Sequence, residues 1–249
     1  MTRKPFKRVL ILTDNLFLFK QFKKIIDGLK FSSTTFTYKY SFVNKDFEKR
    51  FRKDKSFRPL NVKTGYQSII DNFDLVISLH SKQLFPKELV TGVKCINIHP
   101  GFNPYNRGWF PQVFSIINKL PLGATIHEID EKIDHGPIIV QEQIPLYSWD
   151  TSLTAYDRVL AVEIKLISKN IRKIINNTYS SKKMRTEGNL NLKKDFNNLC
   201  QIDLTKTTNN QKFIDRLRAL THGQYSNAFF IDKITGKKVY ISVNLKTNE

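Results

Sequence analysis

The sequence predicts an α/β protein: a Rossmann-like, mostly parallel sheet with helices on both faces, followed by a small C-terminal subdomain of a helix and a β-hairpin. The first observation is a set of short apolar runs typical of buried strands, RVLILT (8–13), DLVISLH (74–80) and KCINIHP (94–100). The second is that segments with helical periodicity lie between such runs. The third is that a hairpin pattern appears only after a long polar stretch near the C-terminus.

The strand at 8–13 leads into an amphipathic helix over residues 14–29. The apolar face of this helix consists of Leu18, Phe22, Ile25 and Leu29. Asp14 is its predicted N-cap, because a short acidic side chain at this position accepts a hydrogen bond from the first helical turn.

Residues 35–42 carry an aromatic side chain at every second position, the period of a half-exposed strand. Residues 44–60 are charged and predict no single element, and a short helix at 65–73 leads into the next strand. In such a sheet, ligands bind beyond the carboxyl ends of the strands. We therefore expect the site in the segments that follow Leu79 and Ile98.

The elements after the third strand continue the same pattern. We expect a helix over 109–120, strands over 123–130 and 136–146, and a long amphipathic helix over 150–175. The candidates for the N-cap of the long helix are Asp150 and Thr151.

Residues 176–208 are rich in Asn, Lys, Thr and Ser and show no periodicity. Beyond them, 210–220 predict a helix, and two short apolar runs around DKITGK (232–237) predict a hairpin. We therefore divide the chain into a catalytic domain, residues 1–178, and a linker with a small C-terminal subdomain, residues 179–249.

The composition is that of a globular protein. Of 249 residues, 40% are apolar, and no run approaches the roughly 18 apolar residues that a membrane span needs. The two cysteines, Cys95 and Cys200, are too few for a disulfide framework or a zinc knuckle. We therefore expect a reduced, cytoplasmic protein with no membrane span.

The formal net charge of +19 raises the question of a nucleic-acid partner. Residues 1–60 carry a net +11 and residues 165–194 a net +8, whereas residues 61–164 carry −3. The basic excess avoids the segment with the most unusual motif, and no nucleic-acid-binding motif accompanies it. We therefore expect solvated helix faces and loops rather than a nucleic-acid surface.

That motif is CINIHPGFNPYNRGWFPQVFSI (95–116), in which Asn97 and His99 leave the same face at the end of a strand. An amide beside an imidazole suits reactions at a carbonyl, because the amide supports a developing oxyanion while the imidazole moves a proton. Asp134, 35 positions after His99, is the candidate that orients the imidazole. Spacing alone leaves a second interpretation open, in which these side chains only cap the strand and shape a turn.

The sequence lacks the residues that several other types of reaction require. The remaining histidines, His80, His127, His135 and His222, show no metal-ligand spacing. The sequence has no G-x-S-x-G elbow, and TDNLFLF follows the first strand where a dinucleotide or phosphate site needs a glycine-rich turn. These absences favour direct transfer between two bound substrates, without a metal.

The stretch NIHPGFNPYNRGWFPQVFSI, followed by PLGATIHEIDEKIDHGPII, resembles the catalytic signature of the folate-dependent formyltransferases. The resemblance is strong over about residues 74–160. It implies that Asn97, His99 and Asp134 are the catalytic set and that N10-formyltetrahydrofolate is the co-substrate, with no metal.

Within this family, PLYSWDTS and RALTHGQYSNAFF are most similar to sugar N-formyltransferases that act on dTDP-linked amino-deoxysugars. This resemblance implies formylation of dTDP-4-amino-4,6-dideoxyglucose for a surface polysaccharide such as O-antigen. One alternative is a 3-amino sugar. The other, motivated by the charge, is a basic, RNA-interacting enzyme of the methionyl-tRNA type.

The resemblance also implies binding residues, taken from the loops after the strands and from the C-terminal part. For the folate donor they are His80, Lys82, Gln83, Leu84, Phe85, Asp130 and Ile133. For the sugar nucleotide they are Lys82, Asn103, Tyr105, Arg107, Trp109, His222 and Tyr225. The alternatives are that Arg107 anchors the loop and that Tyr105 and Trp109 are structural. The apolar C-terminal hairpin further predicts a homodimer.

Overall fold

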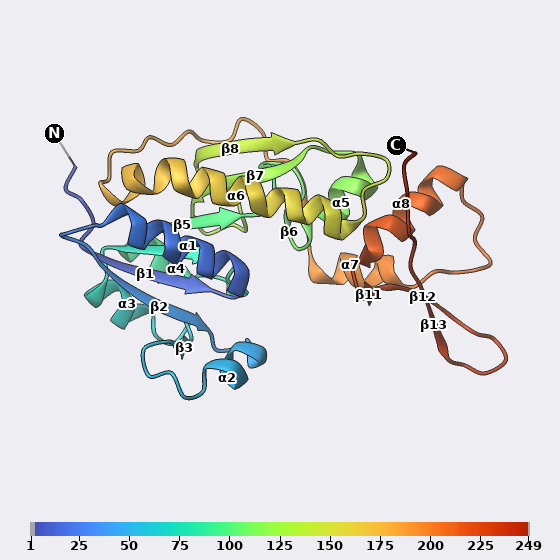
Figure 1. Cartoon of the computed structure of the whole chain (residues 1–249), viewed down its shortest axis with the longest axis horizontal. Helices are drawn as coiled ribbons and strands as arrows, with labels where there is room; N and C mark the ends of the chain where they lie inside the picture. The colour runs from blue at the N-terminus through green and yellow to red at the C-terminus, as the bar shows by residue number, and fades with distance from the viewer. Residues whose placement is uncertain (1–2, 249) are drawn as a thin grey trace.

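The computed structural model describes residues 3–248 and has a seven-stranded sheet at its centre (Figure 1). The strand order is β3-β2-β1-β4-β5-β7-β8. The bounds are β1 (Arg8–Thr13), β2 (Thr35–Ser41), β3 (Arg58–Leu60), β4 (Leu75–Leu79), β5 (Lys94–His99), β7 (Leu122–Glu128) and β8 (Ile138–Ile144). The first five strands are parallel, and β7 runs antiparallel to both β5 and β8. The predicted mostly parallel α/β sheet is confirmed.

Helices cover both faces of the sheet, as predicted. Helices α1 (Leu16–Leu29) and α6 (Ser152–Ile175) pack on one face, and α3 (Tyr66–Asn72) and α4 (Lys87–Gly92) on the other (Figure 1). The alternation along β1 explains this: Val9 and Ile11 join the first apolar cluster, whereas Leu10 and Leu12 join the second. Because both faces are covered, the strands read as unbroken apolar runs in the sequence.

Helix α6 begins after Thr151, one of the two predicted caps, whose hydroxyl accepts a hydrogen bond from the Thr154 backbone. The predicted cap of α1 is wrong, because Asn15 and not Asp14 accepts the hydrogen bond of Leu18 N at 3.0 Å. The Asp14 carboxylate instead accepts from Lys82 N at 2.7 Å and from Ser41. Asp14 therefore ties β2 to the loop after β4.

The charged segment 44–60 folds as α2 (Lys45–Phe51) and the edge strand β3. Its apolar residues explain why: Phe47 and Phe57 pack around Tyr40 in a separate aromatic cluster. Phe57 lies 5.2 Å from the Tyr40 ring, centroid to centroid. The sequence pattern did not show this cluster, because its members come from three different elements.

The C-terminal part packs against α5 (Pro111–Asn118). Its helices are α7 (Lys193–Cys200) and α8 (Asn210–Leu220), and its hairpin is β12 (Ala228–Ile231) with β13 (Lys238–Ile241). Two further short strand pairs are β6 (Arg107–Gly108) with β9 (Leu190–Asn191), and β10 (Thr221–His222) with β11 (Tyr225–Ser226). The predicted helix at 210–220 and the hairpin are confirmed, whereas the stretch read as linker contains α7.

A shared core joins this part to the rest of the chain, since Val113 and Ile116 of α5 pack with Leu217, Leu220 and Ala228. The proposed division after residue 178 stays a prediction. None of the helices within residues 3–248 combines the length and apolar character needed to cross a membrane.

Candidate active site

Asn97, His99 and Asp134 meet at the carboxyl end of β5. Asn97 and His99 leave the same face of this strand, and the loop after the neighbouring β7 returns Asp134 to them. Asn97 Nδ2 donates a hydrogen bond to Asp134 Oδ1 at 2.9 Å. His99 Nδ1 lies 3.5 Å from Asp134 Oδ2. Asp134, which lies 35 positions after His99 in the chain, therefore joins Asn97 and His99 in one polar group.

The segment after β5 holds the Asp134 loop in place. Asp134 has a positive φ of 45°, a backbone conformation that a non-glycine residue keeps only when its surroundings fix it. Gly108 N donates to Asp134 Oδ2 at 3.0 Å, and Asn103 Nδ2 donates to the Asp134 carbonyl at 2.9 Å. Arg107 donates to the carbonyl of Ile133 at 3.0 Å. These contacts fix the direction of the carboxylate.

Asn103, Tyr105 and Arg107 were expected as ligands of the sugar nucleotide, and this role stays a prediction. Asn103 and Arg107 are buried, and their polar groups bind the loop that carries Asp134. Tyr105 is half-buried in the same segment. All three lie outside the lining of the cavity described below, so the structure gives their predicted sugar contacts no support.

His99 is almost fully buried, with 4% of its surface exposed. Burial lowers the pKa of its imidazole to about 4, although the neighbouring Asp134 carboxylate opposes this shift. The ring is therefore neutral at neutral pH. Its Nε2 is buried against Gly101 and has no hydrogen-bond partner among residues 3–248, so this ring nitrogen is unpaired.

Asp134 keeps its charge although it is buried. Burial alone would raise the pKa of this carboxyl, but His99, His127 and the hydrogen bond from Gly108 N together hold it below its usual range. The carboxylate therefore presents a fixed negative charge beside the His99 imidazole.

His127 is a site residue that the sequence analysis considered only as a metal ligand. It is the register partner of Asn97 on β7, is 1% exposed, and its ring lies 6.1 Å from the His99 ring. Its Nδ1 lies 2.6 Å from the carbonyl of Glu128, which can only accept, so Nδ1 carries the proton. Its Nε2 then accepts from Asn97 at 3.4 Å. The alternation of side chains along β7 was the sequence signal that could have indicated the place of His127 at the site.

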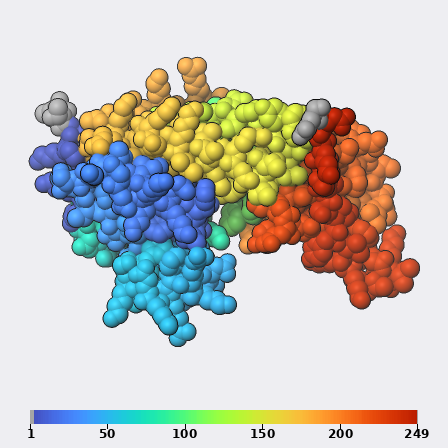
Figure 2. Space-filling model, in the orientation of Figure 1, coloured from blue at the N-terminus to red at the C-terminus, as the bar shows by residue number. Residues whose placement is uncertain are grey.

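A cavity of about 1090 Å³ opens over this group. Figure 2 shows the molecule hollowed between the blue N-terminal part and the red C-terminal part, below the yellow helix α6. Pockets for one ligand usually measure about 300–1,000 Å³, so this cavity lies at the upper end of that range. Of the predicted folate residues it is lined by His80, Lys82, Gln83, Leu84, Phe85, Asp130 and Ile133, and of the predicted sugar-nucleotide residues by Lys82, Trp109, His222 and Tyr225.

The side chain of Gln83 holds the loop of residues 80–85 in place. The Gln83 side chain donates to the carbonyl of Leu60 at 2.9 Å and accepts from Val62 N at 3.0 Å. Phe85 packs against the apolar cluster under α3 and α4, whereas Leu84 is 71% exposed at the rim. The polar atoms of Gln83 thus hold the loop, and the exposed atoms of its neighbours face the cavity.

The opposite wall comes from the segment after β5 and from the C-terminal part. Trp109 is partly exposed there, and Lys193 Nζ lies 5.4 Å from the centre of its ring. His222 is bonded through Nδ1 to Ser152 Oγ at 3.1 Å, and Tyr225 is 61% exposed. An aromatic face beside a lysine suits a planar anionic ligand.

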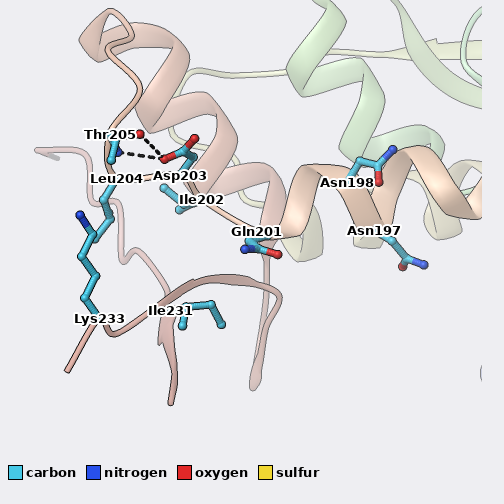
Figure 3. Close-up of a pocket in the computed structure, with 9 residues that line it drawn as sticks. All are labelled: Asn197, Asn198, Gln201, Ile202, Asp203, Leu204, Thr205, Ile231 and Lys233. Atoms are coloured by element: carbon cyan, nitrogen blue, oxygen red, sulfur yellow. Dashed lines mark hydrogen bonds between the residues drawn. The ribbon is translucent and has the colours of Figure 1, made fainter. Parts of the chain in front are cut away.

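A second pocket, of about 550 Å³, lies on the C-terminal part (Figure 3). It is formed by the end of α7, the loop after it and the β12–β13 hairpin, where Thr205 bonds to Asp203. None of the predicted site residues lines it. Within the described part of the chain, no three His, Cys, Asp or Glu side chains are grouped as a metal site.

Comparison with known families matches two parts of the chain. Residues 40–171 match the family described as formyl transferase, and residues 195–247 match the N-formyltransferase dimerization C-terminal domain.

Individual relatives agree with these matches. The chain is 51% identical over 178 residues to the dTDP-4-amino-4,6-dideoxyglucose formyltransferase of Mycobacterium tuberculosis, which covers 72% of this chain and 76% of the relative. A solved 4-N formyltransferase from Francisella tularensis is 44% identical, with a TM-score of 0.91 over 97% of this chain and 99% of that one. A solved sugar N-formyltransferase from Shewanella sp. is 41% identical, with a TM-score of 0.92 over 98% and 99%.

Proposed function

The chain belongs to the formyl transferase family, and we propose that it moves the formyl group of N10-formyltetrahydrofolate onto the amine of dTDP-4-amino-4,6-dideoxyglucose. The observation that carries this proposal is the meeting of Asn97, His99 and Asp134 at a cavity of about 1090 Å³. The 51% identical relative of that name supports the choice of sugar.

The reaction needs an unprotonated amine, because the nitrogen lone pair attacks the formyl carbon. The two N–H groups of Asn97 Nδ2 face Asp134 Oδ1 at 2.9 Å and His127 Nε2 at 3.4 Å; in this proposal the longer bond gives way, and its N–H donates to the oxygen on which negative charge develops. His99 accepts a proton from the attacking nitrogen at its free Nε2. It then returns this proton to N10 of the folate, as the bond between N10 and the formyl carbon breaks.

Asp134 acts on the other side of the imidazole. Its carboxylate stabilises the imidazolium that forms during the transfer, and its position near Nδ1 favours the tautomer in which Nε2 is free. The neutral resting state of His99 supports this role, because a protonated imidazole has no lone pair to offer.

We place the folate against the loops 80–85 and 130–134 and the sugar nucleotide against the opposite wall. Trp109 and Lys193 supply an aromatic face and a positive charge for the base and diphosphate of the nucleotide. Lys82 lines the cavity from the first wall and offers a second cation.

We also propose that the protein is a cytoplasmic homodimer that serves surface polysaccharide synthesis, including O-antigen. The match of residues 195–247 to a dimerization domain supports the dimer, as do the exposed apolar side chains Val239 and Tyr240 on the hairpin. Both cysteines, Cys95 and Cys200, are free and buried, which fits a reducing compartment.

The test uses purified protein with the folate donor, and the 4-amino and 3-amino dTDP-sugars assayed separately without RNA. We expect formamide product from the 4-amino sugar, and at least a 10²-fold loss of kcat in His99→Asn with little change in sugar affinity. Product only from the 3-amino sugar, or only from charged tRNA with salt-sensitive binding, would establish one of the alternatives.

A further inference from the structure

A chain of four polar side chains runs behind the cavity wall and has no part in the mechanism above. It begins at Asn15, the cap of α1, and continues through Tyr156 and His80 to Glu163 in the middle of α6. Tyr156 and His80 also line the cavity. The chain therefore connects the cavity to a carboxylate that is completely buried.

The direction of each hydrogen bond follows from the atoms involved. Asn15 Oδ1 accepts from Leu18 N, so Asn15 Nδ2 is a donor, and it faces both Tyr156 Oη at 3.0 Å and His80 Nδ1 at 3.3 Å. The Tyr156 hydroxyl is then free to donate to His80 Nδ1 at 3.1 Å. His80 Nε2 donates to Glu163 Oε1 at 2.7 Å. In this arrangement the proton of the His80 ring lies on Nε2, and Nδ1 presents a lone pair that accepts the hydrogen bond of Tyr156.

Two features of this chain are costly for the fold. Glu163 has no exposed surface, and its Oε2 finds no hydrogen-bond partner within residues 3–248. An ionised carboxylate in such a place is strongly unfavourable unless a positive charge accompanies it. His80 has a positive φ of 53°, which costs a non-glycine residue about 1–3 kcal/mol. A fold keeps such features where the site requires them.

His80 is also close to the proposed reaction. Leu79 and Ile98 are register partners on neighbouring parallel strands, so His80, which follows β4, and His99, the last residue of β5, come next at the same sheet edge. The preceding register partners on these two strands are Ser78 and Asn97. The four hydrogen-bonded side chains therefore reach the cavity beside the catalytic set.

The proposed reaction has a proton to dispose of. At neutral pH a sugar amine arrives largely as an ammonium ion, whereas the product is a neutral formamide. The substrate nitrogen therefore loses two protons, and N10 of the folate takes only one. His99 can carry the proton that goes to N10, but its buried imidazole is a weak acceptor for a proton from an ammonium ion.

We propose that Tyr156 and His80 form a proton relay, with Glu163 as its positioning residue, that removes the first proton from the ammonium group of the incoming sugar. In this step the N–H bond of the ammonium breaks and a new O–H bond forms at Tyr156 Oη. The original hydroxyl proton passes to His80 Nδ1, giving an imidazolium paired with the Glu163 carboxylate. After product release, the proton leaves to solvent by the same route.

The surroundings of His80 are compatible with this role. The titratable or charged groups facing it or its partners are Glu163, Tyr156 and Asp157 on α6, Asp14 before α1, Lys82 in its own loop, His99 on β5 and His222 on β10. Burial raises the pKa of Tyr156, so Tyr156 is a hydroxyl that relays protons rather than a base. Among these groups, Glu163 is the only carboxylate that is hydrogen-bonded to the His80 ring.

The inference rests on the proposed function and is tested by the pH dependence of kcat/KM for the amino sugar between pH 6 and 9, at saturating folate. Glu163→Gln keeps an acceptor for His80 Nε2 but removes the charge. We expect it to lose about 10²-fold at pH 6.5 and less than threefold at pH 9, where solution supplies the neutral amine. Tyr156→Phe should give the same profile, and the double variant should be no worse than either single variant.

The control is Glu142→Gln, which removes a carboxylate from an ion pair with Lys165 on the outside of α6 and should change nothing. An equal loss at every pH, or full activity of Glu163→Gln at pH 6.5, would overturn the relay. Should Glu163→Gln fail to fold in a thermal scan, Tyr156→Phe decides alone by the same criterion. Absence of formamide with the unaltered protein would instead overturn the proposed function, so the two failures are distinguishable.

Discussion

The contact between Gly101 and His99 gives a sharp test of the site geometry. A Cβ atom at position 101 would lie 2.4 Å from His99 Nε2 and 3.3 Å from the Pro111 side chain. Ordinary contacts between such atoms are about 3.5 Å, so Gly101→Ala must displace the imidazole by about 1 Å. Gly101 has no positive φ to complicate the change.

A displacement of about 1 Å at a reacting group costs about 10²-fold in rate, so we expect kcat of Gly101→Ala to fall by about that factor. The overpacked site should also lose about 1–3 kcal/mol of unfolding free energy. Steady-state kinetics and urea unfolding measure the two effects. If the His99 ring is the obstacle, the stability loss should largely disappear when Gly101→Ala is made in a His99→Ala background.

Gly28→Ala is the matched control, because no atom lies within 4 Å of the position that its Cβ would take in α1. It should leave kcat unchanged and raise stability by up to about 1 kcal/mol, the usual gain for alanine over glycine within a helix. Unchanged kcat and stability in Gly101→Ala would refute the position assigned to the His99 ring.

Three further predictions concern charge and assembly. Asp134→Asn should lower kcat by about 10³-fold, because an amide no longer stabilises the imidazolium; wild-type turnover would contradict its role. His99 has a lowered pKa, so its contribution to stability is complete above the unfolded value of about 6.5 and declines as pH falls toward 4, by about 3 kcal/mol in total. Urea unfolding at pH 4.5 and 7 should therefore show a larger acid loss in the wild type than in His99→Gln. Tyr240→Glu places a charge on the exposed hairpin and should shift the protein to a monomer in sedimentation; an unchanged dimer would exclude that surface.

Much of the fold was predictable because its signals are local. The strands β1, β4 and β5 are apolar runs that both faces of the sheet bury, and α6 shows its apolar stripe over 24 residues. Helices α2 and α7 were missed, because each is short, highly charged or polar, and stabilised by residues distant in the sequence. Local periodicity carries no information about such contacts.

The same limit applies to the site. Asn97 and His99 share a strand, so their common face followed from alternation. The hydrogen bond of Asn103 did not, because its partner, the carbonyl of Asp134, is reached only through the folded loop. Asp14 shows the same limit. Its position in the sequence predicted a helix cap and did not indicate that its carboxylate accepts a hydrogen bond from Lys82 N.

The most direct measurement is formamide formation by the purified protein from N10-formyltetrahydrofolate and dTDP-4-amino-4,6-dideoxyglucose, followed by mass spectrometry in parallel with His99→Asn. We expect one formyl group transferred per sugar by the wild type, and a rate at least 10²-fold lower for the variant with the folded state retained. A wild type that forms no formamide, or a variant that forms it at the wild-type rate, would contradict the assignment of the three converging side chains.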